Sequence, residues 1–102
     1  MITDVRIINN PSKACLEMFY RKMHVKDVEI LKGIRFNSIG LVQANVSSIF
    51  YYADLVTKAS NVYPFEIVGN CPTTITTLAF FGDTSAVATA MRAVENDTKN
   101  HK

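Results

Sequence analysis

The residue with the clearest chemical potential in this 102-residue chain is Cys71, which stands in a short turn, Gly69-Asn70-Cys71-Pro72. Gly69 and Asn70 tolerate positive φ, whereas Pro72 fixes φ and donates no N–H. Such a turn keeps the backbone tight and leaves the sulfur poorly shielded. Because an exposed thiol is a redox liability, a turn that displays one needs a reason. Cys71 is therefore either an incidental turn thiol or a ligand whose partners come from elsewhere.

Within a single chain, the sequence offers Cys71 no partner. Cys15 lies far ahead of it and neither belongs to a CxxC pair, which argues against a disulfide framework and a zinc site. Cys15 is interpreted as a small buried hydrophobe in a helix. His24 has no second histidine or carboxylate at metal-ligand spacing. Because paired-carboxylate, GxSxG and P-loop motifs are also absent, the sequence predicts a protein that is not an enzyme.

Length and composition limit the class of protein further. A chain of 102 residues usually forms one domain, and its 48% apolar content hints at additional burial between subunits. A net charge of +2 without an aromatic-interleaved basic patch argues against nucleic acid. The N-terminus lacks an apolar signal region, and no run approaches the ~20 apolar residues of a membrane span. We therefore expect a protein of the bacterial cytoplasm without a membrane partner.

The first third of the chain predicts a strand and a helix. Residues 5–8 are rich in β-branched side chains and favour a strand. Asn10 or Ser12 is expected to cap a helix, whose apolar positions recur at helical spacing: Leu16, Phe19, Tyr20 and Met23. Residues 24–37 are the least defined part, and within them residues 28–31 favour a strand or an extended arm.

The remainder predicts alternating strands and helices. The expected elements are a strand over 39–44, a helix from Ser47 or Ser48 to about residue 60, strands over 64–68 and 73–81 joined by the 69–72 turn as a hairpin, and a helix capped by Gly82-Asp83. This order predicts an α+β fold in which helices flank one antiparallel sheet.

Three runs in this second part are more specific than the pattern of elements. They are Ser38–Val42, Ala53–Val62 and Gly82–Ala90. Together they resemble the shell-protein domain of bacterial microcompartments (BMC), where a Gly-Leu strand precedes an Ala-Asp-x-x-x-Lys-Ala-x-Asn-Val helix end, a hairpin, and Gly-Asp with an alanine-rich helix. Residues 5–12 resemble the terminal strand of that domain moved to the front. The resemblance therefore implies a circularly permuted BMC domain over residues 1–96, followed by a disordered tail over 97–102.

The resemblance also implies an assembly. Shell proteins of this family form cyclic hexamers, so the expected partners are copies of the same chain and other shell proteins, and the expected location is the microcompartment shell. The turn formed by Gly69, Asn70, Cys71 and Pro72 would line the central pore. Lys58 matches the lysine that packs against its symmetry mate at the lateral edge between hexamers. The family's arginine between two prolines appears here as Asn10, a departure from the pattern at the same edge.

A pore-loop cysteine before a proline resembles one subgroup, the permuted shell proteins of glycyl-radical-type microcompartments, some of which bind an iron–sulfur cluster. Thiolates hold such clusters, and a symmetry axis supplies them from separate chains. The resemblance thus implies a cluster of the 4Fe–4S type held by Cys71, for electron transfer or cofactor passage. Because four irons do not match sixfold symmetry, three cysteines with one exogenous ligand, or partial occupancy, are expected.

A second interpretation from a different class stays open. A small ferredoxin-like regulatory module that binds a metabolite between subunits would have the same fold class and size. Assembly separates the two hypotheses. A hexameric ring or flat sheets would favour the shell protein, whereas a dimer or trimer with a ligand-dependent melting shift would favour the regulator.

Overall fold

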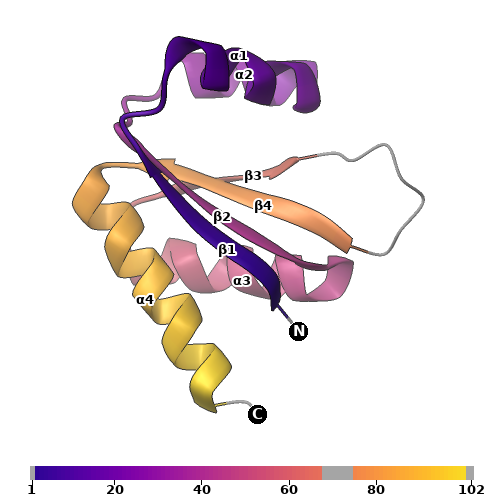
Figure 1. The fold of residues 1–102 in the computed structure, drawn as a ribbon, viewed down its shortest axis with the longest axis vertical. Coiled ribbons are helices and arrows are strands. Elements are labelled where there is room, and N and C mark those ends of the chain that lie inside the picture. Colours follow the sequence, from indigo (N-terminus) through magenta and orange to yellow (C-terminus); the bar gives the residue numbers. More distant parts are fainter. Residues whose placement is uncertain (1, 68–74, 101–102) are drawn as a thin grey trace.

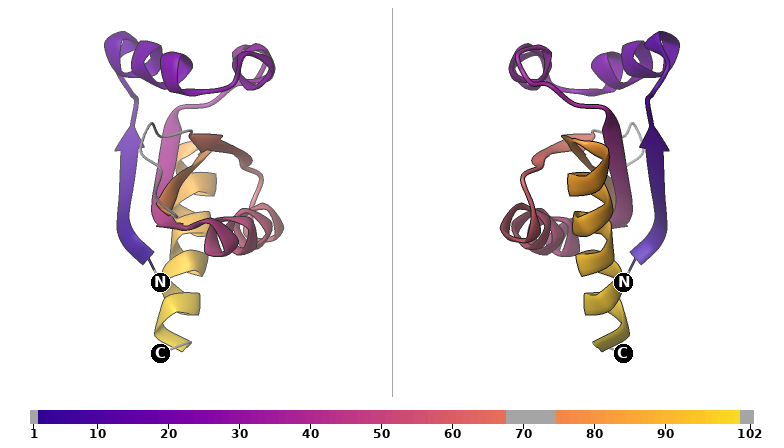
Figure 2. Two further views of the ribbon diagram at one scale, coloured as in Figure 1. Left: turned by 90° about the vertical axis from the view of Figure 1, so that its right-hand side faces the viewer. Right: turned by 90° about the vertical axis from the view of Figure 1, so that its left-hand side faces the viewer.

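The computed structural model describes residues 2–67 and 75–100, and their strands form one antiparallel sheet with the order β1-β2-β4-β3 (Figure 1). Helices α1 and α2 lie on one face of the sheet, and α3 and α4 lie on the other (Figure 2). The predicted α+β fold is confirmed. The elements in chain order are β1 (Ile2–Asn9), α1 (Lys13–Lys22), α2 (Val25–Lys32), β2 (Ser38–Asn45), α3 (Val46–Ala59), β3 (Tyr63–Ile67), β4 (Ile75–Gly82) and α4 (Thr84–Asn100).

The register gives the sheet two distinct ends. At one end Asn45, the last residue of β2, pairs with Ile75, the first residue of β4. We call this the loop end, because residues 68–74 connect β3 to β4 there. At the other end, which we call the opposite end, Ser38 pairs with Gly82. Since β4 has eight residues and a strand rises about 3.3 Å per residue, roughly 25 Å separates the two ends.

Alternation along β4 divides the core between the two faces of the sheet. Leu78 and Phe80 point toward α3 and α4, whereas Ala79 and Phe81 point toward α1 and α2. Four residues of α4, Val87, Ala90, Met91 and Val94, are buried against the first of these faces. A sheet buried on both faces in this way explains the high apolar content of the chain.

Phe81 lies at the centre of the core between the sheet and helices α1 and α2. Its ring meets Phe19 of α1, Phe36 ahead of β2 and Phe65 of β3 edge to face, with centroid separations of 5.8, 5.0 and 5.7 Å. Pairs of this geometry stabilise by about 0.5–1.5 kcal/mol each beyond the area they bury. No residue of α1 is buried, and the helix contacts this core through its partly buried side chains Leu16, Phe19 and Tyr20.

Ser38 ties three segments together at the opposite end. This side chain is completely buried, and its Oγ donates to Asn9 Oδ1 at 2.8 Å. The same oxygen lies 2.9 Å from Thr84 Oγ1, with which it shares a second hydrogen bond. A buried hydroxyl is tolerated only when it is hydrogen-bonded, so these contacts fix the end of β1 and the start of α4 against β2.

Residues 25–32 form helix α2, so the strand or extended arm predicted for 28–31 is wrong. His24 caps this helix, since its Nδ1 accepts a hydrogen bond from the backbone N–H of Lys26 at 3.2 Å. Gly33 ends it, with its N–H directed to the carbonyl of Ile30. The helical spacing of the inward-facing Val28 and Leu31 therefore outweighs the β-branched character of the segment.

The N-cap residue predicted for α1 is confirmed, whereas the one predicted for α3 is wrong. Ser12 caps α1, as expected, because its Oγ accepts from Cys15 N at 3.1 Å. For α3, however, the cap is Asn45 rather than Ser47 or Ser48. Its side-chain oxygen accepts from Ser48 N at 3.1 Å, which satisfies one of the donors at the helix start.

Helix α4 continues to Asn100, beyond the start of the tail that we expected to be disordered over 97–102. Two contacts explain the extension within the described residues. Tyr51 of α3 donates its phenol to Asp97 Oδ1 at 2.6 Å, and Thr98 Oγ1 donates to the carbonyl of Val94 at 3.0 Å. The helix end is thus held by α3 as well as by its own backbone.

The substitution Gly40→Ala should strongly destabilise the protein. Gly40 pairs with Phe80, and a Cβ at position 40 would fall within the fully buried ring of that phenylalanine. We expect urea unfolding to show a loss of about 3 kcal/mol, at the upper end for an overpacked core. Gly33→Ala is the matched control, because its Cβ would meet only Ile30 O at an ordinary 3.5 Å. Equal stability of the two variants would contradict this packing.

The Tyr51–Asp97 contact predicts a pH effect. The hydrogen bond to Asp97 raises the pKa of Tyr51, and desolvation and the negative charge of Asp97 add to the rise. A raised tyrosine pKa means that this stabilisation is complete below pH ~10 and is lost as pH rises through the raised pKa. Ultraviolet titration of phenolate should therefore show a late-ionising component. Asp97→Asn should shift it to lower pH and Tyr51→Phe should remove it, whereas Tyr63→Phe should leave it in place.

Candidate functional site

The loop end is where the sequence predicted the functional turn. Gly69, Asn70, Cys71 and Pro72 lie outside the described residues, but the strands that lead to them are described. Strands β3 and β4 pair antiparallel, as the predicted hairpin requires, up to Ile67 and Thr77, and Thr76 Oγ1 donates to the carbonyl of Ile67 at 3.3 Å. Ile67 and Ile75, the described residues on either side of the 68–74 segment, therefore lie at the same end of the sheet, where α3 begins.

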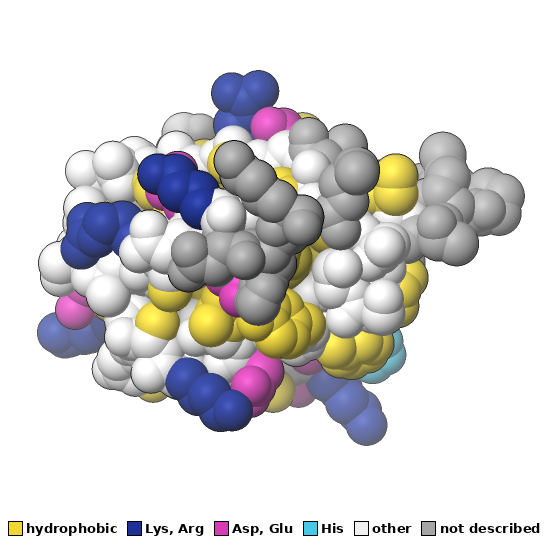
Figure 3. Space-filling model, turned by 90° about the horizontal axis from the view of Figure 1, so that it is seen from below, with side chains coloured by type: hydrophobic (Ala, Val, Ile, Leu, Met, Phe, Trp, Pro, Cys, Tyr) yellow, Lys and Arg dark blue, Asp and Glu magenta, His cyan; other side chains and the backbone are white. Residues whose placement is uncertain are grey.

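Apolar side chains are exposed at the same end of the sheet. Val46 and Phe50 lie one turn apart on α3, and Ile75 follows the segment in β4 beside Asn45. Their exposed fractions are 41, 69 and 45%, respectively. Figure 3 shows hydrophobic side chains gathered on the α3 and α4 side of the molecule. Exposed apolar side chains grouped at one end of a molecule are typical of a surface that another chain covers.

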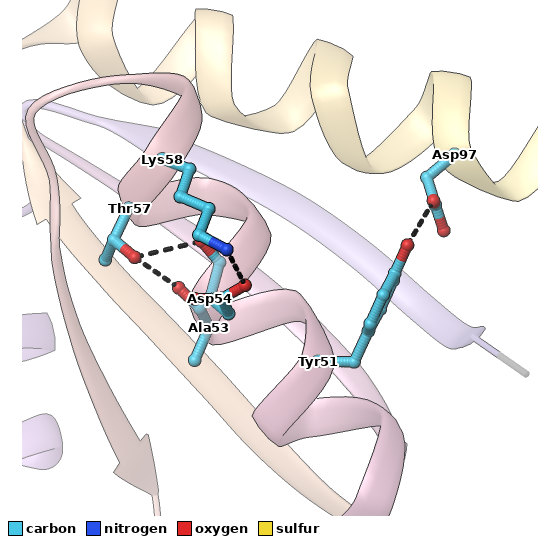
Figure 4. A network of polar contacts seen from close by, with 6 residues as sticks. All are labelled: Tyr51, Ala53, Asp54, Thr57, Lys58 and Asp97. Carbon is cyan, nitrogen blue, oxygen red and sulfur yellow. Dashed lines mark hydrogen bonds and ion pairs between the residues drawn. The ribbon is translucent and has the colours of Figure 1, made fainter.

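The predicted edge residue Lys58 lies near the opposite end, in the last turn of α3. Its Nζ forms an ion pair of 2.8 Å with Asp54 Oδ2, one helical turn earlier (Figure 4). Both side chains are largely exposed, with 75 and 61% of their areas accessible. Thr57, between them, turns its hydroxyl to the backbone carbonyls of Ala53 and Asp54. The pair is therefore free to meet a partner from outside.

Asn10 lies at the same end of the sheet, immediately after β1. Its φ of 51° is in the left-handed region, which asparagine tolerates better than most residues. Its N–H donates to the carbonyl of Asn37 at 2.7 Å, and the Asn37 N–H donates to the carbonyl of Gly82 at 3.1 Å. The left-handed backbone conformation at this position thus explains why asparagine is found there, while its role at a lateral edge stays a prediction.

Sequence reasoning missed a polar groove of about 420 Å³ at the opposite end. Three segments build it: the connection from α2 to β2, the connection from α3 to β3, and the junction of β4 with α4. Its side chains include a cation, an anion, an amide and a phenol; the lining residues are Gly33, Ile34, Arg35, Asn61, Tyr63, Gly82 and Asp83. Because these residues are far apart in the chain, no local motif indicates the groove.

Cys15 lies in a separate, apolar groove of about 250 Å³ beneath α1. It is half-buried, beside Ile8, Phe19 and Ile67. The apolar lining agrees with the interpretation of Cys15 as a small hydrophobe, but the side chain is half-buried rather than buried. Within residues 2–67 and 75–100, no three His, Cys, Asp or Glu side chains are close enough together to hold a metal ion. The described side chains of one subunit therefore do not form a metal centre.

Comparisons with known proteins agree with this fold. The profile of the BMC domain family matches residues 38–102. A ligand-free structure of the GrpU microcompartment shell protein from Pectobacterium wasabiae has a TM-score of 0.75 and 37% identity, covering 90% of this chain and 99% of that one. The GrpU protein from a Clostridiales bacterium has a TM-score of 0.66 and 26% identity, with coverages of 94 and 93%.

The family follows from these matches. The fold is that of a small α+β shell-protein domain, and both GrpU structures are microcompartment shell proteins. This chain belongs to the BMC domain family. Among curated protein sequences no match was found. In the described part of the chain, no helix has the length and hydropathy needed to cross a membrane.

Proposed function

We propose that this chain is a structural protein of a bacterial microcompartment shell and that it assembles into a cyclic hexamer. In this assembly the 68–74 segments of the subunits gather around the axis, and the opposite ends of the sheets face outward. Membership of the BMC domain family and the likeness to two shell proteins support the shell role. A family of structural proteins also fits the prediction that the chain is not an enzyme.

The distribution of side chains between the two ends supports this orientation. Val46, Phe50 and Ile75 expose apolar surface at the loop end, whereas the groove at the opposite end is polar. Covering each of these partly exposed apolar side chains with a neighbouring subunit would stabilise the ring by about 1 kcal/mol. The polar end would lose hydrogen bonds to water if it were placed at the same contact.

We also propose that the domain is circularly permuted. The family match begins at Ser38, the first residue of β2, so β1, α1 and α2 precede it. Strand β1 nevertheless pairs along the length of β2 as an edge strand of the same sheet. A strand that is integral to the sheet but lies ahead of the family match is what a terminal strand moved to the front would produce.

We further propose that the hexamer binds an iron–sulfur cluster at its axis. The described residues contain no set of metal ligands, and Cys71 supplies a single thiolate per chain. The donor set therefore fits a cluster only where several copies meet. Cys71 would hold it, while Gly69, Asn70 and Pro72 shape the turn. When bound, such a cluster would supply one-electron transfer.

The ring is tested by native mass spectrometry. The wild-type protein should be a hexamer at micromolar concentration, and Phe50→Glu should shift it toward smaller species because it places a charge in the apolar contact. Val25→Glu is the control, since Val25 is 72% exposed on α2, away from this surface. A wild-type protein that stays monomeric or dimeric would contradict the hexamer. A dimer or trimer stabilised by a metabolite would favour the regulatory module.

The cluster is tested by anaerobic reconstitution with iron and sulfide. The wild-type protein and Cys15→Ser should become brown, and Cys71→Ser should stay colourless because it lacks the only proposed ligand. Loss of colour in Cys15→Ser alone would show that Cys15, and not Cys71, is the ligand. A colourless wild type would mean that Cys71 is only a turn thiol, and the proposed electron-transfer role would then be wrong.

A further inference from the structure

A small polar pocket of about 170 Å³ opens on the face of the sheet that carries α1 and α2. Its lining residues are Asp4, Arg6, Leu41, Gln43 and Thr77. All five side chains point to this face, because each is an even number of positions along its strand from a residue of the core beneath these helices. Helices α1 and α2 lie toward the opposite end of the strands and leave the pocket uncovered (Figure 2).

The strand register brings the five residues together. Gln43 of β2 pairs with Asp4 of β1 on one side and with Thr77 of β4 on the other. On the neighbouring rung of the same face, Leu41 pairs with Arg6. Opposed side chains on one face of antiparallel strands have Cβ atoms about 4.5–5.5 Å apart. The pocket therefore follows from the pairing of three strands and does not depend on a loop.

Asp4 orients the side chain of Arg6. One carboxylate oxygen of Asp4, Oδ1, accepts from the backbone N–H of Val5 at 3.0 Å, and the other, Oδ2, accepts from Nε of Arg6 at 3.3 Å. Within the described residues, the two terminal nitrogens of the Arg6 guanidinium have no protein partner. Because both side chains are exposed, the ion pair adds little to stability. Its effect is to direct the free edge of the guanidinium.

Two neutral hydrogen-bonding groups stand beside this guanidinium. Gln43 and Thr77 are half-buried, and in the part of the chain that the structure describes neither side chain forms a hydrogen bond with the protein. The amide N–H groups and the hydroxyl can both donate to a ligand. Leu41, which is also half-buried, supplies an apolar wall. The pocket thus combines one cation, two neutral donors and one aliphatic side chain.

We propose that this pocket binds a short-chain carboxylate, which is a monoanion with a small alkyl group. The carboxylate would accept two parallel hydrogen bonds from the terminal nitrogens of Arg6 and a further one from Thr77 or Gln43. The alkyl group would lie against Leu41. At the ~30 Å³ that a water molecule occupies in the liquid, the pocket has room for roughly five non-hydrogen atoms, the size of propionate.

Charge favours a monoanion over other small ligands. A cation would be repelled by Arg6, and the carboxylate of Asp4 is already engaged by two donors. A dianion such as phosphate would bring a second negative charge close to Asp4 with a single arginine to compensate it. A neutral amide or alcohol would form only uncharged hydrogen bonds, which are about half as strong. The inference goes beyond the shell role, and it does not depend on the ring because all five residues belong to one chain.

Saturation-transfer NMR with sodium propionate at constant ionic strength tests the pocket on the whole chain. The wild-type protein should bind propionate saturably, and propionamide, a neutral molecule of the same size, at least about tenfold more weakly. Arg6→Lys should also weaken propionate binding at least about tenfold although it keeps the positive charge, because an ammonium lacks the planar fork. Thr77→Val keeps the shape of the side chain and should weaken binding about fivefold, the effect of one lost hydrogen bond.

Arg21→Lys, the same change on α1 outside the pocket, should leave propionate binding at the wild-type level. Three results would overturn the proposal: no saturable binding by the wild type, equal binding of propionamide, or wild-type affinity in Arg6→Lys, which would show that surface charge alone attracts propionate. Unchanged far-ultraviolet circular dichroism should confirm that each variant is folded. Native mass spectrometry of the same samples separates the two proposals, since propionate binding by a protein that forms no hexamer would contradict the ring and support the pocket.

Discussion

The pairing of β2 with β4 is the constraint on which the rest of the structure depends. These are the two central strands, and near the opposite end the Phe80 ring lies where a side chain of Gly40 would be. The close approach fixes which residues of the two strands face each other. It thereby determines that the 68–74 segment and the start of α3 share one end of the sheet. The groove and the end of α3 share the other.

The two helix layers depend on this sheet in different ways. Helices α3 and α4 pack through fully buried aliphatic side chains, whereas α1 is held mainly by contacts such as that of Phe19 with Phe81. The α3–α4 layer also reaches both ends of the sheet, since α3 begins beside the apolar surface and ends beside Lys58. A single helix thus connects the surface proposed for the ring with the end at which the sequence predicted a lateral edge.

The sequence predicted those parts of the fold in which neighbouring residues decide the structure. The α+β fold follows from the local pattern of strands and helices, the hairpin follows from the chemistry of the 69–72 turn, and the resemblance to the family follows from three short runs. Helix α2 was missed because the β-branched character of Val28 and Ile30 was given more weight than the cap at His24. The last turn of α4 depends on Tyr51, 46 positions before Asp97, so no local pattern could indicate it. The groove likewise combines three distant segments, one of them in the least defined part of the sequence.

The most direct test of the account is cross-linking at Cys71 in a Cys15→Ser background, where each chain carries one thiol. A short bifunctional maleimide joins two thiols only if they lie close together in the assembly. Thiols gathered at an axis should give covalent dimers in high yield at a protein concentration where hexamers do not associate. Arg35→Cys in a background without the native cysteines should give few under the same conditions. Efficient cross-linking at position 35 and none at Cys71 would contradict a ring with the 68–74 segments at its centre.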